Sequence, residues 1–157
     1  METLTPASIY RHAQIRLTTT RPTEFIDLTG YVERLVADSG IDVGFVSVQT
    51  RHTTTAIMVN EHEPLLLDDF QALLRHAAPD DGRYRHDDPN ARTVNVTPGE
   101  RANGHAHCRA LLLAPSVCLN VIGGTLLLGR WQRVFLVELD GPREREISAL
   151  VLGEASR

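Results

Sequence analysis

The stretch SVCLNVIGGTLLLGRWQRVFLVELDGPREREISALVLG, residues 116–153, decides the fold class of this chain. It is rich in β-branched and aliphatic residues, and its breaks fall at glycine and proline. With a bend or interruption at Gly129, it predicts three strands, over 116–122, 124–140 and 144–153. A chain that ends on strands alone, without regular strand–helix–strand spacing before them, is typical of the α+β class.

Working outward from this stretch, four further runs of β-branched and aliphatic residues predict strands over 9–17, 23–28, 42–50 and 54–61. The last of them, TTAIMVNE, has apolar side chains on both faces, which is typical of a central strand. Apolar spacing predicts three helices, over 30–39, 63–77 and 102–113. We therefore expect an α+β protein with about three helices and a mixed, mostly antiparallel sheet or sheets.

Local signals place the ends of these helices. Thr29 is expected to cap the first helix, which Gly40 ends, and Asn103 to open the third. The second helix has Pro64 in its first turn, and its expected buried stripe is Leu66, Phe70, Leu73 and Leu74. The polar stretch 79–101 follows neither period and predicts a long ordered loop, a kind of segment that is often functional.

Length and charge bound the kind of protein. A length of 157 residues fits a single domain, 1–157. The formal net charge of −4 argues against binding nucleic acid, because such proteins concentrate positive charge on one face. All 16 basic residues are arginine, which excludes mechanisms that need a Schiff-base or general-base lysine. The N-terminus lacks the apolar region of a secretion signal and no run is long enough to span a membrane, so we expect a cytoplasmic protein without a membrane partner.

The two cysteines, Cys108 and Cys118, stand ten residues apart in apolar surroundings. This spacing fits neither a zinc pair nor a disulfide framework. We therefore expect buried free thiols.

Three of the seven histidines stand beside other polar groups: His52 before three threonines, His86 in the long loop, and His107 on the third expected helix. Neutral imidazoles are the commonest metal ligands in proteins, and Asp87 or Asp88 could fix the tautomer of a ligand ring. If the three histidines converge, they leave an open fourth position, as in catalytic zinc sites. No two of them have a helical or zinc-finger spacing, so the residues alone leave the metal site open.

The remaining histidines divide by position. Residues two positions apart on a helix point about 200° apart around its axis, so His105 and His107 face opposite ways. Asn103 shares a face with His107, and His105 pairs with Arg109 on the other face. The other histidines stand in charged neighbourhoods and receive no role; they are His12, His62 and His76.

Carboxylates and arginines elsewhere have two alternative roles each. Asp68 and Asp69, near the start of the second helix, either complement the helix dipole or bind Mg²⁺. The arginines of the C-terminal strands either hold phosphate groups or are solvated on exposed faces. They are Arg130, Arg133, Arg143 and Arg145.

Four segments, in this order, resemble the YjbQ family, also called UPF0047. They are HTTTAIMVNE (52–61), RYRHDD (83–88), NGHAHCRALLL (103–113) and LGRWQRVFLVELDGPR (128–143). The resemblance covers nearly the whole chain and implies a small α+β domain that assembles as a homotrimer, with its polar motifs in a cleft. The family is also named secondary thiamine-phosphate synthase. That name implies a transferase that joins an aminopyrimidine-methyl diphosphate to a thiazole phosphate and expels pyrophosphate.

Carried over residue by residue, the resemblance also implies the site. The implied catalytic residues are His52, Thr53, Asn60, Glu61, Asp69 (or Asp68), Asp87 and Arg143. The implied ligands of a divalent metal, Zn²⁺ or Mg²⁺, are His52, His86 and His107. A family Gly-Thr-Trp-Gln motif falls on residues 129–132, where Arg130 replaces the commoner threonine, so a role for a small hydroxyl group there is in doubt.

Three functions stay open at this point. A synthase would use Mg²⁺ on the diphosphate, Arg143 for the leaving pyrophosphate, and Trp131 as an aromatic wall, although a tryptophan there equally fits a core or an interface. A metal-dependent hydrolase of a small phosphorylated or ester substrate would need only the three histidines and a bound water. A non-catalytic trimer would bind a small metabolite or a metal, with its polar motifs holding the subunits together.

Overall fold

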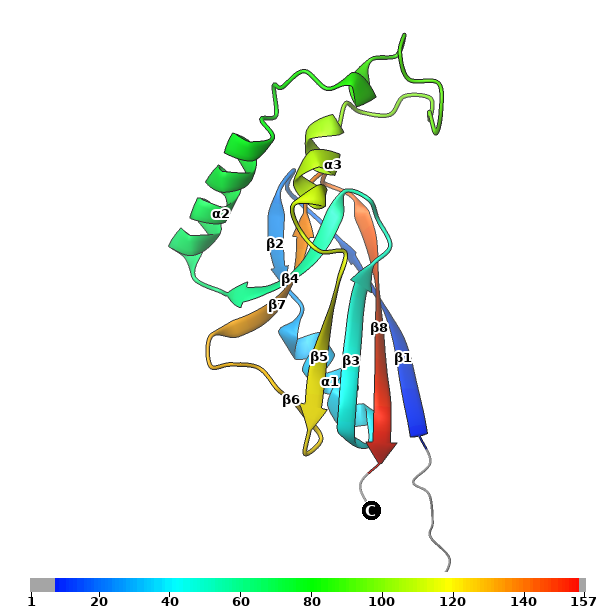
Figure 1. Ribbon diagram of the computed structural model, residues 1–157, viewed down its shortest axis with the longest axis vertical. Helices are drawn as coiled ribbons and strands as arrows, with labels where there is room; N and C mark the ends of the chain where they lie inside the picture. Colours follow the sequence, from blue (N-terminus) through cyan, green and yellow to red (C-terminus); the bar gives the residue numbers. More distant parts are fainter. Residues whose placement is uncertain (1–7, 156–157) are drawn as a thin grey trace, which may run out of the picture.

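A computed structural model describes residues 8–155 of the chain (Figure 1). The ends of the expected domain, 1–7 and 156–157, lie outside the described residues. The expected strands and helices form with shifted ends, and the polar loop contains one short 3-10 helix, η1. In chain order the elements are β1 (Ser8–Thr18), β2 (Glu24–Asp27), α1 (Thr29–Ser39), β3 (Ile41–Thr50), β4 (Thr55–Glu61), α2 (Pro64–Ala77), η1 (Arg85–Asp87), α3 (Gly104–Leu111), β5 (Ser116–Ile122), β6 (Thr125–Leu126), β7 (Gln132–Glu138) and β8 (Glu144–Ala155).

The strands form two sheets. The larger sheet has the order β1-β8-β3-β5-β6 and the smaller sheet the order β2-β7-β4, and every neighbouring pair is antiparallel. The expected interruption at Gly129 is confirmed, and it separates two sheets, because β6 belongs to the larger and β7 to the smaller. The α+β class with three α-helices and a single domain is therefore confirmed for the described residues.

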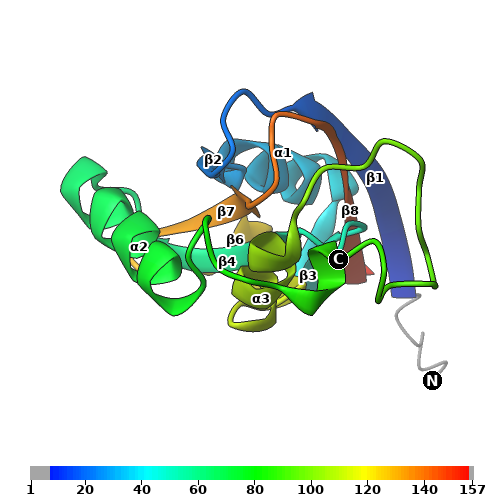
Figure 2. The ribbon, with the colours of Figure 1, turned by 90° about the horizontal axis from the view of Figure 1, so that it is seen from above.

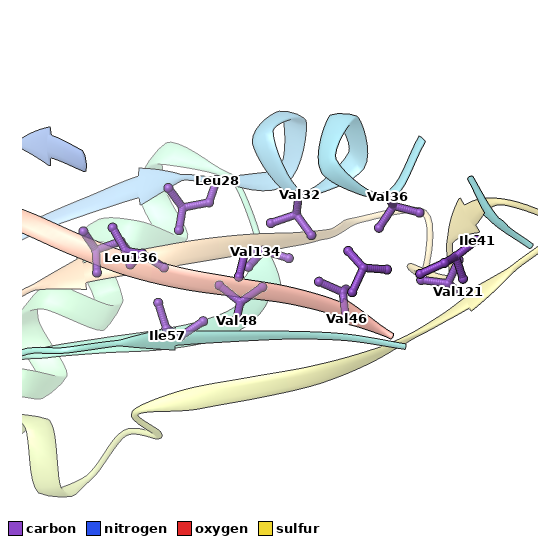
Figure 3. Packing of buried hydrophobic residues seen from close by; sticks show 13 residues of the cluster. Leu28, Val32, Val36, Ile41, Val46, Val48, Ile57, Val121, Val134 and Leu136 are labelled. Atoms are coloured by element: carbon purple, nitrogen blue, oxygen red, sulfur yellow. The ribbon is translucent and has the colours of Figure 1, made fainter. Parts of the chain in front are cut away.

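The first hydrophobic core lies between the two sheets and α1 (Figure 3). Val32 and Val36 of α1 are fully buried, because they follow one another at helical spacing on one face. They meet alternate residues of the strands, such as Val46 of β3 and Val134 of β7. Thirteen buried residues, each with at most 1% of its surface exposed, make this the main core.

A second core covers the other face of the smaller sheet. Along β7, Val134 and Leu136 point into the first core, whereas Phe135 and Val137 point into the second. Leu74 of α2 and Ala106 of α3 close the second core. In Figures 1 and 2, α2 and α3 lie together along this side of the smaller sheet. The cores on both faces of β7 thus fix where α3, and the loop that leads to it, must lie.

The expectation that strand 54–61 is central is wrong. β4 is an edge strand of the smaller sheet, and β7 occupies the centre. Its apolar residues are nevertheless buried on both faces, because Ala56 belongs to the second core and Ile57 to the first. Burial on both faces here comes from the layers above and below the strand, not from strands on both sides.

The first helix does not use the expected cap. Thr29 is the first residue of α1, and its hydroxyl accepts a hydrogen bond from the Val134 backbone N–H at 2.9 Å. The Thr29 N–H instead donates to Asp27 Oδ1 at 2.8 Å. Asn103 precedes α3 as expected, but its side chain makes no capping bond either. Gly40 ends α1 in the left-handed conformation, as expected (φ 71°).

The second helix begins at Pro64, but Glu63 caps it rather than Asp68 or Asp69. The Glu63 carboxylate accepts the N–H groups of residues 65 and 66 at 3.0 and 2.8 Å. Both aspartates lie beyond the first turn and are exposed, so the dipole explanation fails. Within the predicted stripe, Leu74 is buried and Leu66 and Phe70 are partly buried, but Leu73 is 64% exposed.

The cysteines are also exposed, which makes the expectation of buried thiols wrong. Cys118 lies on β5 with its neighbours alternately half-buried and exposed, because only one face of the larger sheet meets the first core. Cys108 lies on α3 away from Ala106, the residue through which that helix joins the second core. Both thiols are free.

The outer face of the larger sheet carries exposed apolar side chains. Tyr10, Val43, Phe45 and Ile122 are 38–74% exposed, and the strand register places them on one face. Among the described residues, no helix has the length and apolar character needed to cross a membrane.

Candidate functional site

Thr55 of the HTTT motif and Thr50, the last residue of β3, hold the turn between β3 and β4. Thr50 and Thr55 hydrogen-bond through their hydroxyl groups, and Thr55 Oγ1 donates to the His52 carbonyl at 3.3 Å. The His52 N–H donates to Thr50 Oγ1 at 3.3 Å. These bonds hold the backbone of His52 in place, while the side chain of Thr53 is exposed.

A cavity of about 430 Å³, called the His52 cavity below, opens beside this turn. Three of the expected site residues line it, although they come from two distant parts of the chain: His52, Thr53 and Arg143. The segment 97–100 of the polar loop forms another wall. The volume falls within the range of small-molecule pockets, about 300 to 1,000 Å³.

A buried ion pair lies against the wall of the His52 cavity. Glu138, fully buried at the end of β7, accepts bonds from Nε and Nη2 of Arg145 at 2.6 Å each. Nη2 of Arg145 also donates to Thr54 Oγ1 at 3.1 Å. Glu138 further accepts the N–H groups of residues 139 and 140. The alternative that Arg145 is solvated is therefore wrong, since it is 4% exposed and its Nε and Nη2 bond inside the protein.

Asp140 holds Arg143 in the cavity. Its Oδ2 atom lies 2.8 Å from Arg143 Nη2 in an ion pair and accepts a hydrogen bond from Asn103 Nδ2 at 3.0 Å. The Arg143 Nε also donates to the Asp140 backbone carbonyl at 3.0 Å. Arg143 is 39% exposed, and within residues 8–155 both N–H groups of its Nη1 have no partner and can meet a ligand.

The His52 ring is neutral and its tautomer is fixed by the sheet. The backbone N–H of Glu146 donates to His52 Nε2 at 2.9 Å, so Nε2 carries no proton and the proton sits on Nδ1. Burial, and then the positive charge of Arg145, lower the pKa of His52 against the opposing effect of Glu138. In this state His52 is a hydrogen-bond donor through Nδ1 and has no free lone pair for a metal ion.

His86 and His107 form a second group. Their ring centroids lie 4.6 Å apart at 59°, which joins η1 of the polar loop to α3. Burial lowers the pKa of His107, and the neighbouring His86 lowers it further, while Asp140 acts in the opposite direction. A neutral ring keeps a lone pair for a metal ion. Within residues 8–155, however, no group of three His, Cys, Asp or Glu residues is arranged to hold a metal ion, so the structure does not gather His52 with this pair.

Asp87 holds the start of α3, the helix that joins Asn103, which lines the His52 cavity, to the His86–His107 pair. Its Oδ1 atom accepts the backbone N–H groups of Asn103 at 3.0 Å and Gly104 at 2.9 Å, which caps the helix. A side chain on Gly104 would collide with Tyr84, because an added Cβ would lie 2.4 Å from the Tyr84 Cβ. Asp87 therefore positions the helix that carries Asn103 and His107.

The other expected site residues lie elsewhere. Asn60 and Glu61 end β4, about 20 Å of strand away from the His52 turn at roughly 3.3 Å per residue. Asp69 is exposed on α2. Neither the strand end nor Asp69 lines the His52 cavity.

Trp131 is not a core residue, since it is 60% exposed, and it does not line the His52 cavity. The Arg130 guanidinium carbon lies 4.6 Å from the centre of its ring, so the residue that replaces the family threonine stacks on the tryptophan.

On α3, His105 and Arg109 lie on the face away from His107, as expected, and both reach Asp80. The sequence expectations omitted three groups of the cavity: Asp140, Glu100 and the hydrogen-bonding role of Asn103. Asp140 stands in a Leu-Asp-Gly-Pro run, which indicates only a turn.

Comparison with known proteins places this fold among proteins of unknown function. The family model described as "UPF0047 protein YjbQ-like" matches residues 13–154. A UPF0047 protein of Methanothermobacter thermautotrophicus is 40% identical over 141 residues, which are 90% of this chain and 91% of that protein. The chain belongs to the YjbQ (UPF0047) family.

Solved structures agree with this assignment. A crystal structure of a YbjQ-like protein of unknown function from Sulfolobus solfataricus has a TM-score of 0.84 at 34% identity, and the match covers 94% of this chain and 100% of that one. A hypothetical protein from Aeropyrum pernix has a TM-score of 0.80 at 37% identity, with 92% and 99% covered. The family is one of unknown function, so an activity has to be argued from the site.

Proposed function

We propose that this protein is an enzyme that binds a small phosphorylated substrate in the His52 cavity. The observation that carries the proposal is the position of Arg143, whose Nη1 donors have no partner in the described part of the chain while Asp140 holds the rest of the guanidinium. His52 Nδ1–H and the Thr53 hydroxyl offer further donors, and all three groups suit phosphate oxygens.

The reaction that fits this cavity best is transfer of the thiamine-phosphate synthase type. In that reaction the bond between the pyrimidine methylene carbon and the diphosphate oxygen breaks, and its electron pair leaves with pyrophosphate. A lone pair of the thiazole nitrogen then forms the new carbon–nitrogen bond. Arg143 and His52 would stabilise the negative charge that develops on the leaving group, which is the kind of contact that lowers a barrier most.

Mg²⁺ would bind such a diphosphate through oxygen ligands. Two carboxylates line the His52 cavity, Asp140 and Glu100. Asp140 is bonded to Arg143 and Asn103, and Glu100 pairs with Arg92. The cavity residues therefore do not fit a protein-bound Mg²⁺ site, and no step is assigned to one.

An activity assay tests the synthase proposal. Replacing Arg143 with alanine should lower kcat/KM for thiamine phosphate formation about 100-fold, since removing one such donor typically costs that much. Arg143→Lys should recover part of the activity, because the charge returns without the fork of donors. Arg34→Ala, at an exposed arginine of α1, is the control and should match the unmodified protein. Equal activity in the Arg143→Ala and control proteins would contradict the proposal.

A second candidate, a metal-dependent hydrolase, is favoured by the His86–His107 contact. We propose that these two rings supply two ligands of a divalent metal and that substrate or water supplies the others. Titration with Zn²⁺ should then shift the ring signals of both histidines in NMR spectra, and His107→Ala should abolish the shift at His86. His76→Ala, at an exposed histidine of α2, is the control. Unchanged ring signals at one equivalent of Zn²⁺ would remove this candidate.

We further propose that the chain assembles as a homotrimer. The exposed apolar side chains on the outer face of the larger sheet, including Tyr10 and Phe45, support an interface there. A non-catalytic, metabolite-binding trimer is the alternative if both assays fail. Sedimentation velocity tests assembly, and a single-chain mass at micromolar concentration would contradict it.

A further inference from the structure

A second cavity of about 650 Å³ shares Asp140 with the His52 cavity. Its walls come from the β1–β2 connection, the last turns of α2 and the start of α3. The side chains that give it its chemical character are Arg21, Gln71, Arg75, Arg101 and His105. None of these residues was expected at a site, and none of them lines the His52 cavity.

The carboxylates of this cavity are already neutralised. Asp80 Oδ1 lies 3.0 Å from Arg109 Nη2 and 3.6 Å from His105 Nε2, and its Oδ2 lies 3.9 Å from Arg75 Nε. Asp140 pairs with Arg143, and with Arg101 at 3.4 Å. Arg109 and Arg143 stand outside the cavity. The three arginines inside it therefore exceed the charge that its two carboxylates can balance.

Two of these arginines retain donors for a ligand. Within residues 8–155 the Arg21 guanidinium has no ion pair or hydrogen bond, and Arg75 has only its distant contact with Asp80. Arg101, in contrast, donates hydrogen bonds to the backbone carbonyls of residues 140 and 141. An anion between Arg21 and Arg75 would meet two forks of N–H groups that come from different elements.

Buried Arg109 fixes this arrangement from behind. It is 1% exposed, and its Nε donates to the carbonyls of Leu74 and Ala78 at 3.2 and 2.9 Å, which ties α3 to the end of α2. Its Nη2 lies at ion-pair distance from Asp80, yet among the described residues it has no aligned hydrogen-bond acceptor. The charge of Asp80 is thus balanced from behind the cavity, which leaves the positive charge of the exposed arginines for a ligand.

We infer that this cavity is a second anion-binding site, which takes the phosphate or carboxylate end of a small metabolite between Arg21 and Arg75. The Gln71 amide and the His105 ring are the other polar groups placed to contact the rest of the molecule. The inference is independent of the proposed synthase, because the residues that bind the anion lie outside the His52 cavity.

Site-resolved NMR titration tests this inference with two probes, inorganic phosphate and malonate. The Arg143→Ala protein is the starting point, so that the His52 cavity does not compete for the anion. The signals of the His105 ring and the Gln71 amide should shift and saturate with at least one probe. Arg21→Ala and Arg75→Ala should each weaken that binding about tenfold, since a hydrogen bond to a charged group contributes about 1.5 kcal/mol or more.

The control is Arg83→Ala, at an exposed arginine in the loop after α2 that belongs to neither cavity. Its binding should equal that of the starting protein. Saturation with phosphate alone identifies a phosphorylated ligand, and saturation with malonate alone a carboxylate. If neither probe saturates, or if Arg83→Ala weakens binding as much as Arg21→Ala does, the site does not exist.

Discussion

Replacing Arg145 with methionine is expected to lower the free energy of unfolding by about 3 to 5 kcal/mol, the usual cost of leaving a buried charge without its partner. Glu138 is fully buried and Arg145 is 4% exposed, so water cannot replace the lost contact. Glu138 would keep the bonds from Thr19 and from the N–H groups of residues 139 and 140, but these carry no positive charge. Urea unfolding at pH 7 measures the loss.

Two comparisons separate this cost from the loss of a large side chain. Arg16→Met removes an arginine that also pairs with a glutamate, at 2.9 Å from Glu146, but on the surface with 73% exposure. Its cost should stay below about 1 kcal/mol. The double variant Arg145→Met with Glu138→Leu should recover most of the lost stability, because no charge is then left buried. A double variant as unstable as Arg145→Met would show that packing, not charge, is responsible.

The sequence predicts which segments form strands and helices better than it predicts which strands lie next to one another in the sheets. Alternating apolar residues and turn residues are local signals, so the strands and the three helices follow from them. Whether a strand lies at the centre or the edge is decided by other parts of the chain. β4 and β7 are both apolar on two faces, yet only β7 has a strand on each side. The separation of β6 from β7 into different sheets is likewise a tertiary outcome.

The candidate site, too, is predicted in part by local sequence motifs and decided in part by contacts between distant residues. The family motifs name His52, His86 and His107. They cannot show that a backbone N–H of β8 donates a hydrogen bond to one ring nitrogen of His52. Because of that bond, between residues 94 positions apart, His52 has no free lone pair with which to bind a metal ion alongside the other two histidines. Asp87 shows the converse case, because a residue expected to act in catalysis caps the helix that carries His107.

Replacing Asp140 with alanine is expected to affect stability and both cavities together. Its carboxylate meets Arg143, Asn103 and Arg101, and it is only 7% exposed. The arginines are partly exposed and can turn to water, so the loss should be about 2 to 3 kcal/mol, less than for Arg145. Without this anchor Arg143 loses its fixed orientation in the His52 cavity. Phosphate binding that depends on Arg143 should weaken at least tenfold, measured by titration of the folded variant.

Asp38→Ala is the control for this prediction, because Asp38 is exposed on α1 and such changes usually stay within about 0.5 kcal/mol. Asp140→Asn adds a sharper comparison. It retains one acceptor oxygen but replaces the other with an NH₂ group that faces the donors of Arg143 or Asn103, so it should recover little of the binding. If Asp140→Asn binds phosphate as tightly as the unmodified protein, the charge of Asp140 does not position Arg143. The link between the β7–β8 connection and the proposed substrate would then be lost.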